Sequence, residues 1–143
     1  MMTSERKFME RCRELAIEAS LTGNTPVGSI IVRDGQIIGE GRESTRPDND
    51  VTRHAEIEAI RDAITQTGEQ KLTGCILFTT HEPCILCSYA IRHYRIGKII
   101  FEKAVPALGG YSSPWPILTV DNVESWGHPP VVIVLNTDSN PDN

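Results

Sequence analysis

Two short motifs set the strongest constraint on how this chain can fold: HAE at residues 54–56 and PCILC at residues 83–87. Two cysteines spaced three apart on a helix project from one face, so Cys84 and Cys87 can both reach a single metal ion. A helix N-terminus also favours the thiolate, which is the form that binds metal. The histidine of the first motif can face the same point if it begins its own helix, with Thr52 as the candidate cap. The fold must therefore bring two helix starts together.

The hydrophobic pattern divides the chain into alternating strands and helices. In chain order it predicts a helix from a Ser4 cap to Gly23, a β-hairpin over 27–38 that turns at Asp34-Gly35, a helix over 51–65, a strand over 75–80, a helix from Pro83 to about Tyr94, a strand over 98–101, a short helix near 119–126 and a strand over 131–135. A strand, a helix and a second strand in that order predict a parallel crossover, because a helix-length connection cannot close a hairpin. The predicted fold is an α/β three-layer α/β/α sandwich, whose mixed five-stranded sheet has an antiparallel hairpin at one edge.

Length and charge limit the remaining possibilities. At 143 residues the chain is expected to form a single domain over 1–143, with a polar tail at 136–143. The N-terminus is rich in mixed charge and no apolar run is long enough to cross a bilayer, so we expect a soluble, cytoplasmic protein with no membrane partner. The net charge is −5, and no Lys or Arg follows Lys103, so charge disfavours nucleic acid as a partner.

The number of ligands indicates which kind of metal site the motifs form. His54, Cys84 and Cys87 are three ligands, whereas a structural zinc site is closed by four, and three ligands plus water are the catalytic pattern. Zinc lowers the pKa of such a water to about 7. Glu56 lies two residues from a ligand and is not needed as one, so it could take a proton from the water and pass it on. The residues therefore predict catalytic Zn2+ with Glu56 as the proton carrier.

Two other interpretations of the cysteine pair remain open. A strand followed by Cys-x-x-Cys at a helix start also describes thioredoxin-like redox sites, but a redox dithiol leaves His54 and Glu56 unexplained. A non-catalytic zinc site would need a fourth ligand, for which Cys12, Cys75 and His81 are candidates. His81 precedes the second motif and could equally line the mouth of a site or pack beside it.

The two motifs resemble the signature of zinc-dependent nucleobase and nucleoside deaminases, and the resemblance extends from about Phe8 to Leu135. Three further segments are similar to the purine and cytosine branch of that family, namely PVG at 26–28, GEG at 39–41 and CILFTT at 75–80. This branch includes guanine deaminases, fungal cytosine deaminases and tRNA-adenosine deaminases. The resemblance implies a cytidine-deaminase-like sandwich, zinc on the histidine and the two cysteines, proton transfer by the motif glutamate, and a homodimer.

By the same resemblance, several residues are expected to contact the substrate. The backbone N–H groups of Ala55 and Cys84 would face the substrate, and the carbonyl of Glu82 would accept a hydrogen bond from its leaving amino group. Relatives often close the pocket with a C-terminal helix, whereas here a polar tail at 136–143 follows Leu135, so we expect the lid to come from elsewhere. Tyr111 and Trp115 in the long final connector could instead stack on a planar base, or a neighbouring subunit could supply the wall.

Glu43 departs from the family pattern. Many relatives carry asparagine eleven residues before the metal-binding histidine, where its amide grips the base, and here that position is Glu43. An ionised carboxylate only accepts hydrogen bonds. Glu43 therefore favours a substrate edge with two donors, such as the amino-amidine group of guanine, isocytosine or an aminotriazine.

These residues favour a hydrolase that acts on a cyclic amidine C–N bond. We expect water to replace the amino group of a free nucleobase or related amino-heterocycle and to release ammonia, with guanine as first candidate and cytosine, isocytosine or an aminotriazine next. The substrate is then a small molecule. Deamination of tRNA adenosine or of another nucleic acid is the alternative, which stays open if Arg42, Arg46, Arg92 and Arg95 share a face. A zinc-stabilised module without activity is the third hypothesis.

Overall fold

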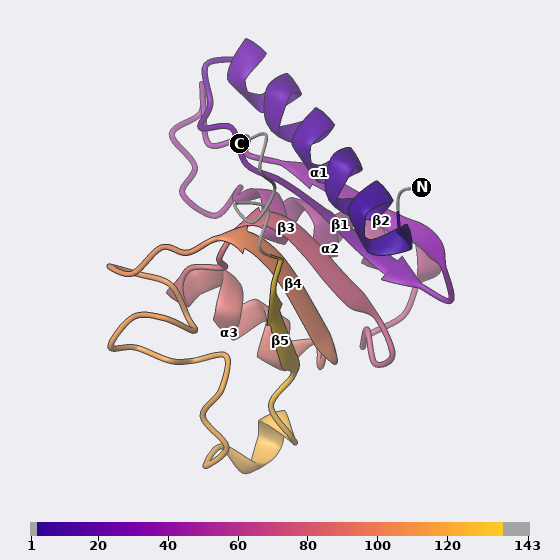
Figure 1. The fold of residues 1–143 in the computed structure, drawn as a ribbon, viewed down its shortest axis with the longest axis vertical. Helices are drawn as coiled ribbons and strands as arrows, with labels where there is room; N and C mark the ends of the chain where they lie inside the picture. The colour runs from indigo at the N-terminus through magenta and orange to yellow at the C-terminus, as the bar shows by residue number, and fades with distance from the viewer. Residues whose placement is uncertain (1–2, 136–143) are drawn as a thin grey trace.

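The computed structural model describes residues 3–135, which contain one five-stranded sheet between helices (Figure 1). Its elements in chain order are α1 (Ser4–Leu21), β1 (Gly28–Arg33), β2 (Gln36–Arg42), α2 (Ala55–Thr67), β3 (Ile76–His81), α3 (Ile85–His93), β4 (Lys98–Lys103), the 3-10 turn η1 (Glu124–Trp126) and β5 (Val131–Val134). The polar tail expected at 136–143 lies outside the described residues, and a single domain over 1–143 stays a proposal. Within the described part of the chain, no helix combines the length and the apolar character needed to span a membrane.

The strands lie in the order β2-β1-β3-β4-β5. β1 pairs antiparallel with β2 and with β3, whereas β3, β4 and β5 run parallel. α3 connects β3 to β4, which is the crossover that parallel neighbours require. The hairpin turns at Asp34 and Gly35, both with left-handed φ, as the sequence predicts. The predicted mixed sheet with an antiparallel hairpin at one edge is therefore confirmed.

The two faces of the sheet carry separate apolar clusters. Successive side chains of β3 show the division, because Leu77 belongs to the cluster that includes residues of α2 and α3, and Phe78 belongs to the cluster that includes residues of α1. A strand alternates its side chains between the two faces of its sheet. α1 therefore covers one face and α2 with α3 the other (Figure 1), which confirms the three-layer α/β/α sandwich.

Two predicted helix boundaries outside the motifs are wrong. Thr3, rather than Ser4, caps α1, because the Thr3 side chain accepts a hydrogen bond from the backbone N–H of Arg6 at 3.2 Å. The short helix expected near 119–126 is only the 3-10 turn Glu124–Trp126. Before this turn, the N–H groups of Thr119 and Val120 donate to the carbonyl of Pro116 at 3.0 and 3.1 Å, and residues 120–123 form no helix.

The caps of α2 and α3 are themselves motif residues. His54, rather than the predicted Thr52, is the N-cap of α2, with extended backbone angles of φ −68° and ψ 154°. Pro83 lies before α3 rather than in its first turn, and Cys84 is the N-cap with φ −73° and ψ 179°. Neither side chain makes a capping hydrogen bond, and the thiol of Cys84 instead contacts Sγ of Cys87. The imidazole and the thiol are therefore free to bind elsewhere.

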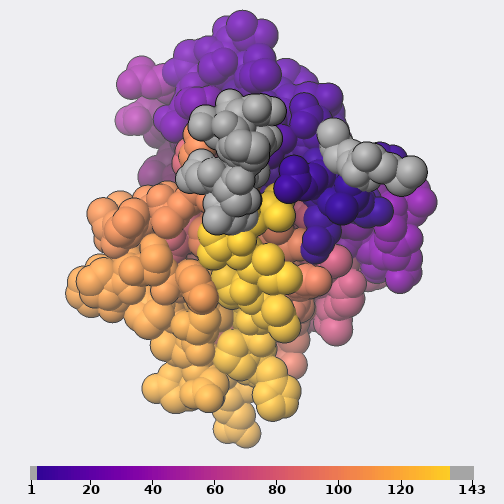
Figure 2. All heavy atoms as spheres, in the orientation of Figure 1, coloured from indigo at the N-terminus to yellow at the C-terminus, as the bar shows by residue number. Residues whose placement is uncertain are grey.

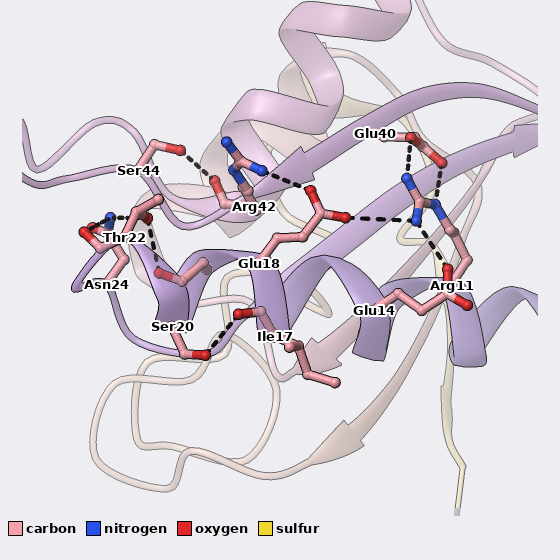
Figure 3. A network of polar contacts seen from close by, with 11 residues as sticks. Arg11, Glu14, Ile17, Glu18, Ser20, Thr22, Asn24, Glu40, Arg42 and Ser44 are labelled. Atoms are coloured by element: carbon pink, nitrogen blue, oxygen red, sulfur yellow. Dashed lines mark hydrogen bonds and ion pairs between the residues drawn. The ribbon is translucent and has the colours of Figure 1, made fainter.

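A network of charged side chains ties α1 to β2 (Figure 3). Arg11 of α1 donates to both carboxylate oxygens of Glu40 on β2, at 2.7 and 2.9 Å. Glu18 of α1 accepts from Arg42 at 2.6 Å, and Figure 3 shows these side chains pointing toward one another from the helix and the strand. Surface ion pairs contribute at most about 1 kcal/mol each. The network therefore mainly orients α1, and it engages Arg42, one of the basic residues considered for nucleic acid.

Close packing of α2 on β2 depends on Gly41. A Cβ at this position would lie 2.2 Å from the carbonyl oxygen of Ala55 and 2.3 Å from the backbone nitrogen of Ala59. Gly41→Ala is therefore expected to destabilise the fold by about 1–3 kcal/mol, the usual cost of overpacking. Thermal unfolding followed by circular dichroism measures the loss. Gly97→Ala is the matched control, because a Cβ at Gly97 meets nothing within 4 Å. Equal melting temperatures for the two variants would contradict the prediction.

Candidate metal centre

Two connecting segments bring the motifs to the same end of the sheet. The loop 43–54 leads from β2 to α2 and is closed by a backbone hydrogen bond of 2.9 Å from Ser44 to Arg53. The turn 82–84 leads from β3 to α3. α2 and α3 pack in the same cluster on one face of the sheet, so their first residues lie close together.

The ligand atoms of His54, Cys84 and Cys87 form a compact triangle. Nδ1 of His54 lies 3.4 Å from Sγ of each cysteine, and the two Sγ atoms lie 3.7 Å apart. Tetrahedral zinc, with Zn–S of about 2.3 Å and Zn–N of about 2.0 Å, requires N···S edges of about 3.5 Å and an S···S edge of about 3.8 Å. The triangle therefore fits one face of a zinc tetrahedron, and these three residues are placed to bind a metal ion.

No fourth protein ligand joins this triangle among residues 3–135. Cys12 and Cys75 are buried in the apolar clusters on opposite faces of the sheet. The ring of His81 contacts the hydroxyl of Thr80, with 2.9 Å between Nδ1 and Oγ1. None of the three lies with the triad atoms, which are all within 4.8 Å of one another. The arrangement matches the three-ligand catalytic pattern and disfavours a closed structural site.

Contacts within the triad lower the pKa of one member and raise the pKa of the other two. The hydrogen bond from Cys87, with a further one from His54, lowers the pKa of Cys84 to about 4. The contact with Cys84 raises the pKa of His54 to about 9, and it raises the pKa of Cys87 well above that of an ordinary thiol. Cys84 is thus a thiolate at neutral pH, ready to bind metal. A divalent cation would replace the protons on the other two residues, because metal-bound imidazole is neutral and metal-bound cysteine is deprotonated.

Glu56 lies in the first turn of α2 and is only 4% exposed. Burial raises the pKa of its carboxyl to about 8, and the negative charges of Cys84 and Glu43 contribute to the shift. A carboxyl whose pKa lies near neutrality can both take up and release a proton, as general acid–base catalysis requires. The environment of Glu56 is therefore compatible with the predicted role of proton carrier.

Glu43 is turned toward the start of α2. Its Oε1 accepts a hydrogen bond from the backbone N–H of Ala55 at 3.0 Å, and no residue among 3–135 donates to its Oε2. Burial raises the pKa of the Glu43 carboxyl. The Ala55 N–H that the resemblance assigns to the substrate is thus already engaged by a side chain of the protein. The substrate contact predicted for Glu43 itself stays a prediction.

The carboxylate of Glu82 holds the connector between β4 and β5, a role that the sequence analysis missed. It accepts hydrogen bonds from the backbone N–H groups of Val105, Tyr111 and Ser112, at 2.8, 2.8 and 2.7 Å. A Cβ at Gly109 would lie 2.0 Å from Glu82 Oε2, so the glycine is needed for this close approach. Burial by itself raises the pKa of Glu82, but the hydrogen bonds from the hydroxyl of Ser112 and from these backbone N–H groups lower it below its ordinary value. In the sequence, the paired glycines at 109–110 are the only local sign that another group comes so close to the backbone of the connector.

Glu82→Gln is expected to destabilise the protein by about 2–4 kcal/mol, because each buried N–H left without an acceptor costs about 1–3 kcal/mol. The amide of glutamine keeps one acceptor oxygen, but its NH2 group would face the N–H donors of Tyr111 and Ser112. Urea unfolding measures the change. Glu69→Gln, at an ion pair in which the Glu69 side chain is 46% exposed, is the control and should have little effect. A similarly small change for both variants would show that the connector does not need the Glu82 carboxylate.

The other predicted substrate contacts have different surroundings. Tyr111 and Trp115 lie on the connector and are 41% and 56% exposed, and the rings of Tyr111 and Phe101 form an edge-to-face pair with 6.2 Å between centroids. The carbonyl of Glu82 receives no hydrogen bond from another described residue. Cys84 pairs with Gly109 in a β-bridge, so the connector runs directly beside this ligand. The contacts of these residues with a substrate stay predictions.

One of the four arginines that were considered for binding nucleic acid is buried in the interior of the protein. Arg92 is 1% exposed, and its guanidinium donates to the carbonyls of Ile117 and Val120 at 2.8 and 2.7 Å. It also lies over the ring of Trp126, 4.9 Å from the centroid. The condition that Arg92 shares an exposed face with the other three arginines is therefore not met, because α3 turns this side chain toward the connector.

Comparison with protein families gives one match over most of the chain. The model of the cytidine and deoxycytidylate deaminase zinc-binding region matches residues 2–103. Among curated proteins, the tRNA-specific adenosine deaminase of Aquifex aeolicus is 40% identical over 127 residues, which are 87% of this chain and 84% of that protein. The tRNA(Ile)-lysidine synthase of Deinococcus deserti is 40% identical over 119 residues, which are 82% of this chain but only 22% of that protein.

Two solved structures are similar over large parts of the fold. One comes from a study of A-to-I editing by tRNA deaminases at the wobble position of transfer RNA. It has a TM-score of 0.85 and 32% sequence identity, and the match covers 93% of this chain and 100% of that chain. The other is guanine deaminase from Bacillus subtilis, with a TM-score of 0.67 and 39% identity over 72% of this chain and 66% of that chain.

Proposed function

We propose, from the premise that this chain belongs to the family of zinc-binding cytidine and deoxycytidylate deaminases, that its substrate is an adenosine in transfer RNA. Membership of this family makes the chain a zinc-dependent hydrolytic deaminase. The choice of substrate is carried by one observation, the likeness to a tRNA wobble-position deaminase that extends over the whole of that structure. The relatives from Aquifex aeolicus and Streptococcus pyogenes, described as tRNA-specific adenosine deaminases, support the same choice.

The proposed reaction replaces the amino group at C6 of adenine with oxygen. Water adds to C6, the bond from C6 to the amino nitrogen breaks, and the products are inosine and ammonia. Zinc on His54, Cys84 and Cys87 would supply a water whose pKa is lowered to about 7. Glu56 takes a proton from this water and delivers it to ring nitrogen N1, and it then carries a second proton to the departing amine. The carbonyl of Glu82 accepts a hydrogen bond from that amine.

The proposed nucleic-acid substrate is the opposite of what the net charge led us to expect, namely that nucleic acid is disfavoured as a partner. The value of −5 describes the whole chain, whereas a phosphate responds mainly to charges within a Debye length of about 10 Å. Arg46 lies on the loop 43–54 that ends at a metal ligand, is exposed, and forms no ion pair with any residue among 3–135. The same loop also carries Glu43, Asp48 and Asp50 against Arg46 and Arg53, so the proposal of an RNA substrate rests on the relatives and not on charge.

Deamination of guanine is the second candidate, and Glu43 is the observation that favours it. The free oxygen of an ionised Glu43 accepts hydrogen bonds, and guanine offers N–H donors on its ring edge and its exocyclic amine. The ring nitrogens of adenine are acceptors, which a carboxylate would repel. The similarity to guanine deaminase from Bacillus subtilis supports this candidate over about two thirds of either chain.

Product analysis separates the two candidates. The zinc-loaded protein is incubated with a tRNA transcript that carries adenosine at the wobble position and, separately, with free guanine. Inosine in the digested tRNA, detected by mass spectrometry, with no ammonia from guanine, is the expected result. Ammonia from guanine without inosine in tRNA would overturn the first candidate in favour of the second. Absence of both products would favour the non-catalytic zinc module.

The homodimer implied by the resemblance also stays a proposal. Family relatives are commonly dimers, which is its support. Sedimentation velocity of the zinc-loaded protein at micromolar concentration tests it, and a single species with the mass of one chain would exclude a stable dimer.

A further inference from the structure

The connector between β4 and β5 presents two large aromatic rings at the surface. Trp115 is 56% exposed and Tyr111 is 41% exposed, although rings of this size are usually largely buried. Figure 2 shows the connector, in orange, as one lobe of the molecular surface. We refer to Tyr111 and Trp115 as the aromatic pair. Exposed rings of this kind form an apolar surface that a binding partner can cover.

The aromatic pair belongs to the segment that runs beside a metal ligand. Cys84 forms a β-bridge with Gly109, and two backbone hydrogen bonds flank it: Ile85 donates to the carbonyl of Leu108 at 3.1 Å, and Gly110 donates to that of Pro83 at 2.8 Å. Tyr111 follows directly in the sequence. The aromatic pair therefore lies on the segment whose backbone pairs with that of a metal ligand.

The backbone of this segment is held in place before any partner binds. Glu82 accepts from the N–H of Tyr111, and the hydroxyl of Ser113 accepts from the N–H of Trp115 at 3.0 Å. The same hydroxyl donates to the carbonyl of Gly109. A surface that is ordered in advance loses less conformational entropy on binding, which favours affinity.

The segment around the aromatic pair carries no charge. Residues 104–120 contain no Asp, Glu, Lys or Arg, in a chain whose net charge is −5. Apart from the Glu82 carboxylate that binds its backbone, this segment therefore offers an uncharged surface. Exposed flat rings are suited to stacking on nucleobases, and stacking tolerates any base because every base has a π-face.

We propose that the aromatic pair stacks on nucleotides that flank the reactive nucleotide in a single-stranded RNA loop. This inference rests on the proposed function, since it takes RNA as the substrate. Bases in a duplex are stacked on one another, so only unpaired nucleotides can offer their faces to protein rings. The aromatic pair thus selects a single-stranded context, while the metal centre acts on the nucleotide between or beside the stacked bases.

RNA binding by variants of the zinc-loaded full-length protein tests the proposal. A fluorescent RNA hairpin with an adenosine in its loop is titrated and the dissociation constant is read from anisotropy. Trp115→Ala and Tyr111→Ala are each expected to weaken binding by about 5- to 150-fold, which corresponds to about 1–3 kcal/mol per stacked base. Trp115→Phe keeps a ring and should retain most of the affinity. In turnover assays the loss should lie in KM and not in kcat.

Leu108 provides the matched control, because it lies on the same segment and is 56% exposed, like Trp115, but has no ring. Leu108→Ala is expected to bind the hairpin as the unmodified protein does. An equal loss for Leu108→Ala and Trp115→Ala would indicate general apolar contact and would overturn stacking. Melting temperatures of all variants verify that each one is folded.

Two outcomes distinguish this inference from the proposed function. If inosine forms in tRNA but neither alanine variant of the aromatic pair changes hairpin binding, the stacking proposal is overturned and the function stands. If the hairpin binds through Trp115 but no inosine forms, the function is overturned and the RNA-binding surface stands. An equal loss of affinity for free guanine or adenosine would place the rings on the reactive base, and that result also overturns the flanking role.

Discussion

Replacing Glu56 with glutamine is expected to lower the rate of deamination by about 100- to 10,000-fold, the usual contribution of a general acid–base group. Glutamine is nearly the same shape, but its amide cannot take a proton from water. Glu56 is 4% exposed and is not one of the triad ligands, so bound zinc and the fold should persist. The rate is measured as inosine formed in tRNA, and zinc is measured by elemental analysis of the same sample.

Glu58 is the matched control for this substitution. It lies in the same first turn of α2, but its carboxylate contacts Arg53 at 3.4 Å and is not part of the triad. Glu58→Gln is therefore expected to keep the rate of the unmodified protein. Equal rates for Glu56→Gln and Glu58→Gln would mean that no proton passes through Glu56.

Removing the buried thiol of Cys87 is expected to abolish stable zinc binding and, with it, activity. Loss of a residue that only orients a ligand already weakens metal binding by about 10- to 100-fold, so loss of a ligand atom should cost more than about 100-fold. Cys87 is fully buried and its Sγ is one corner of the triangle, so alanine leaves two ligands and a gap. After dialysis against a weak chelator, Cys87→Ala should carry almost no zinc per chain.

Cys75 is a suitable comparison, because it is 1% exposed and belongs to the apolar cluster on the same face of the sheet. Cys75→Ala should retain zinc and activity, with at most a small loss of stability. Stoichiometric zinc in dialysed Cys87→Ala would show that the metal is held elsewhere. Loss of zinc from both variants would indicate a folding effect, which the melting temperatures would reveal.

The metal ligands are predictable from the sequence because helix geometry is local. Cys84 and Cys87 are three residues apart, which places both on one side of a helix start whatever the rest of the chain does. His54 joins them through the resemblance of the two motifs to the deaminase signature, and the structure brings its Nδ1 to 3.4 Å from both sulfurs. The sheet is predictable for a similar reason, since the strand and helix patterns are regular and the order of elements limits the topology.

Helix caps are less predictable, because several side chains near a helix start can serve. Thr52 has the right chemistry for the cap of α2, but it hydrogen bonds to Asp50 within the preceding loop. His54 occupies the cap position instead, without a capping hydrogen bond. Which residue caps the helix thus depends on the path of the loop 43–54, and that path depends on contacts with other parts of the chain.

The surroundings of the metal centre are set by contacts between residues far apart in the sequence. Glu82 binds backbone groups 23 to 30 residues further along the chain, and Glu43 engages an N–H 12 residues away. Arg92 could be read as a surface charge in the sequence, yet it is buried beneath the connector. No periodicity or motif encodes such pairings, so the contacts around the metal centre and the exposure of the aromatic pair could not be predicted.

The sequence by itself determined the layered fold through the order of its elements, and it determined the family, the zinc ligands and the expected proton carrier through two motifs that resemble the deaminase signature. Only the tertiary structure decided that the triad has no fourth protein ligand among the described residues, that Glu82 anchors the connector beside Cys84, and that two aromatic rings remain exposed there. The physical reason is that these features depend on distances across the fold, which arise only when strands and helices pack.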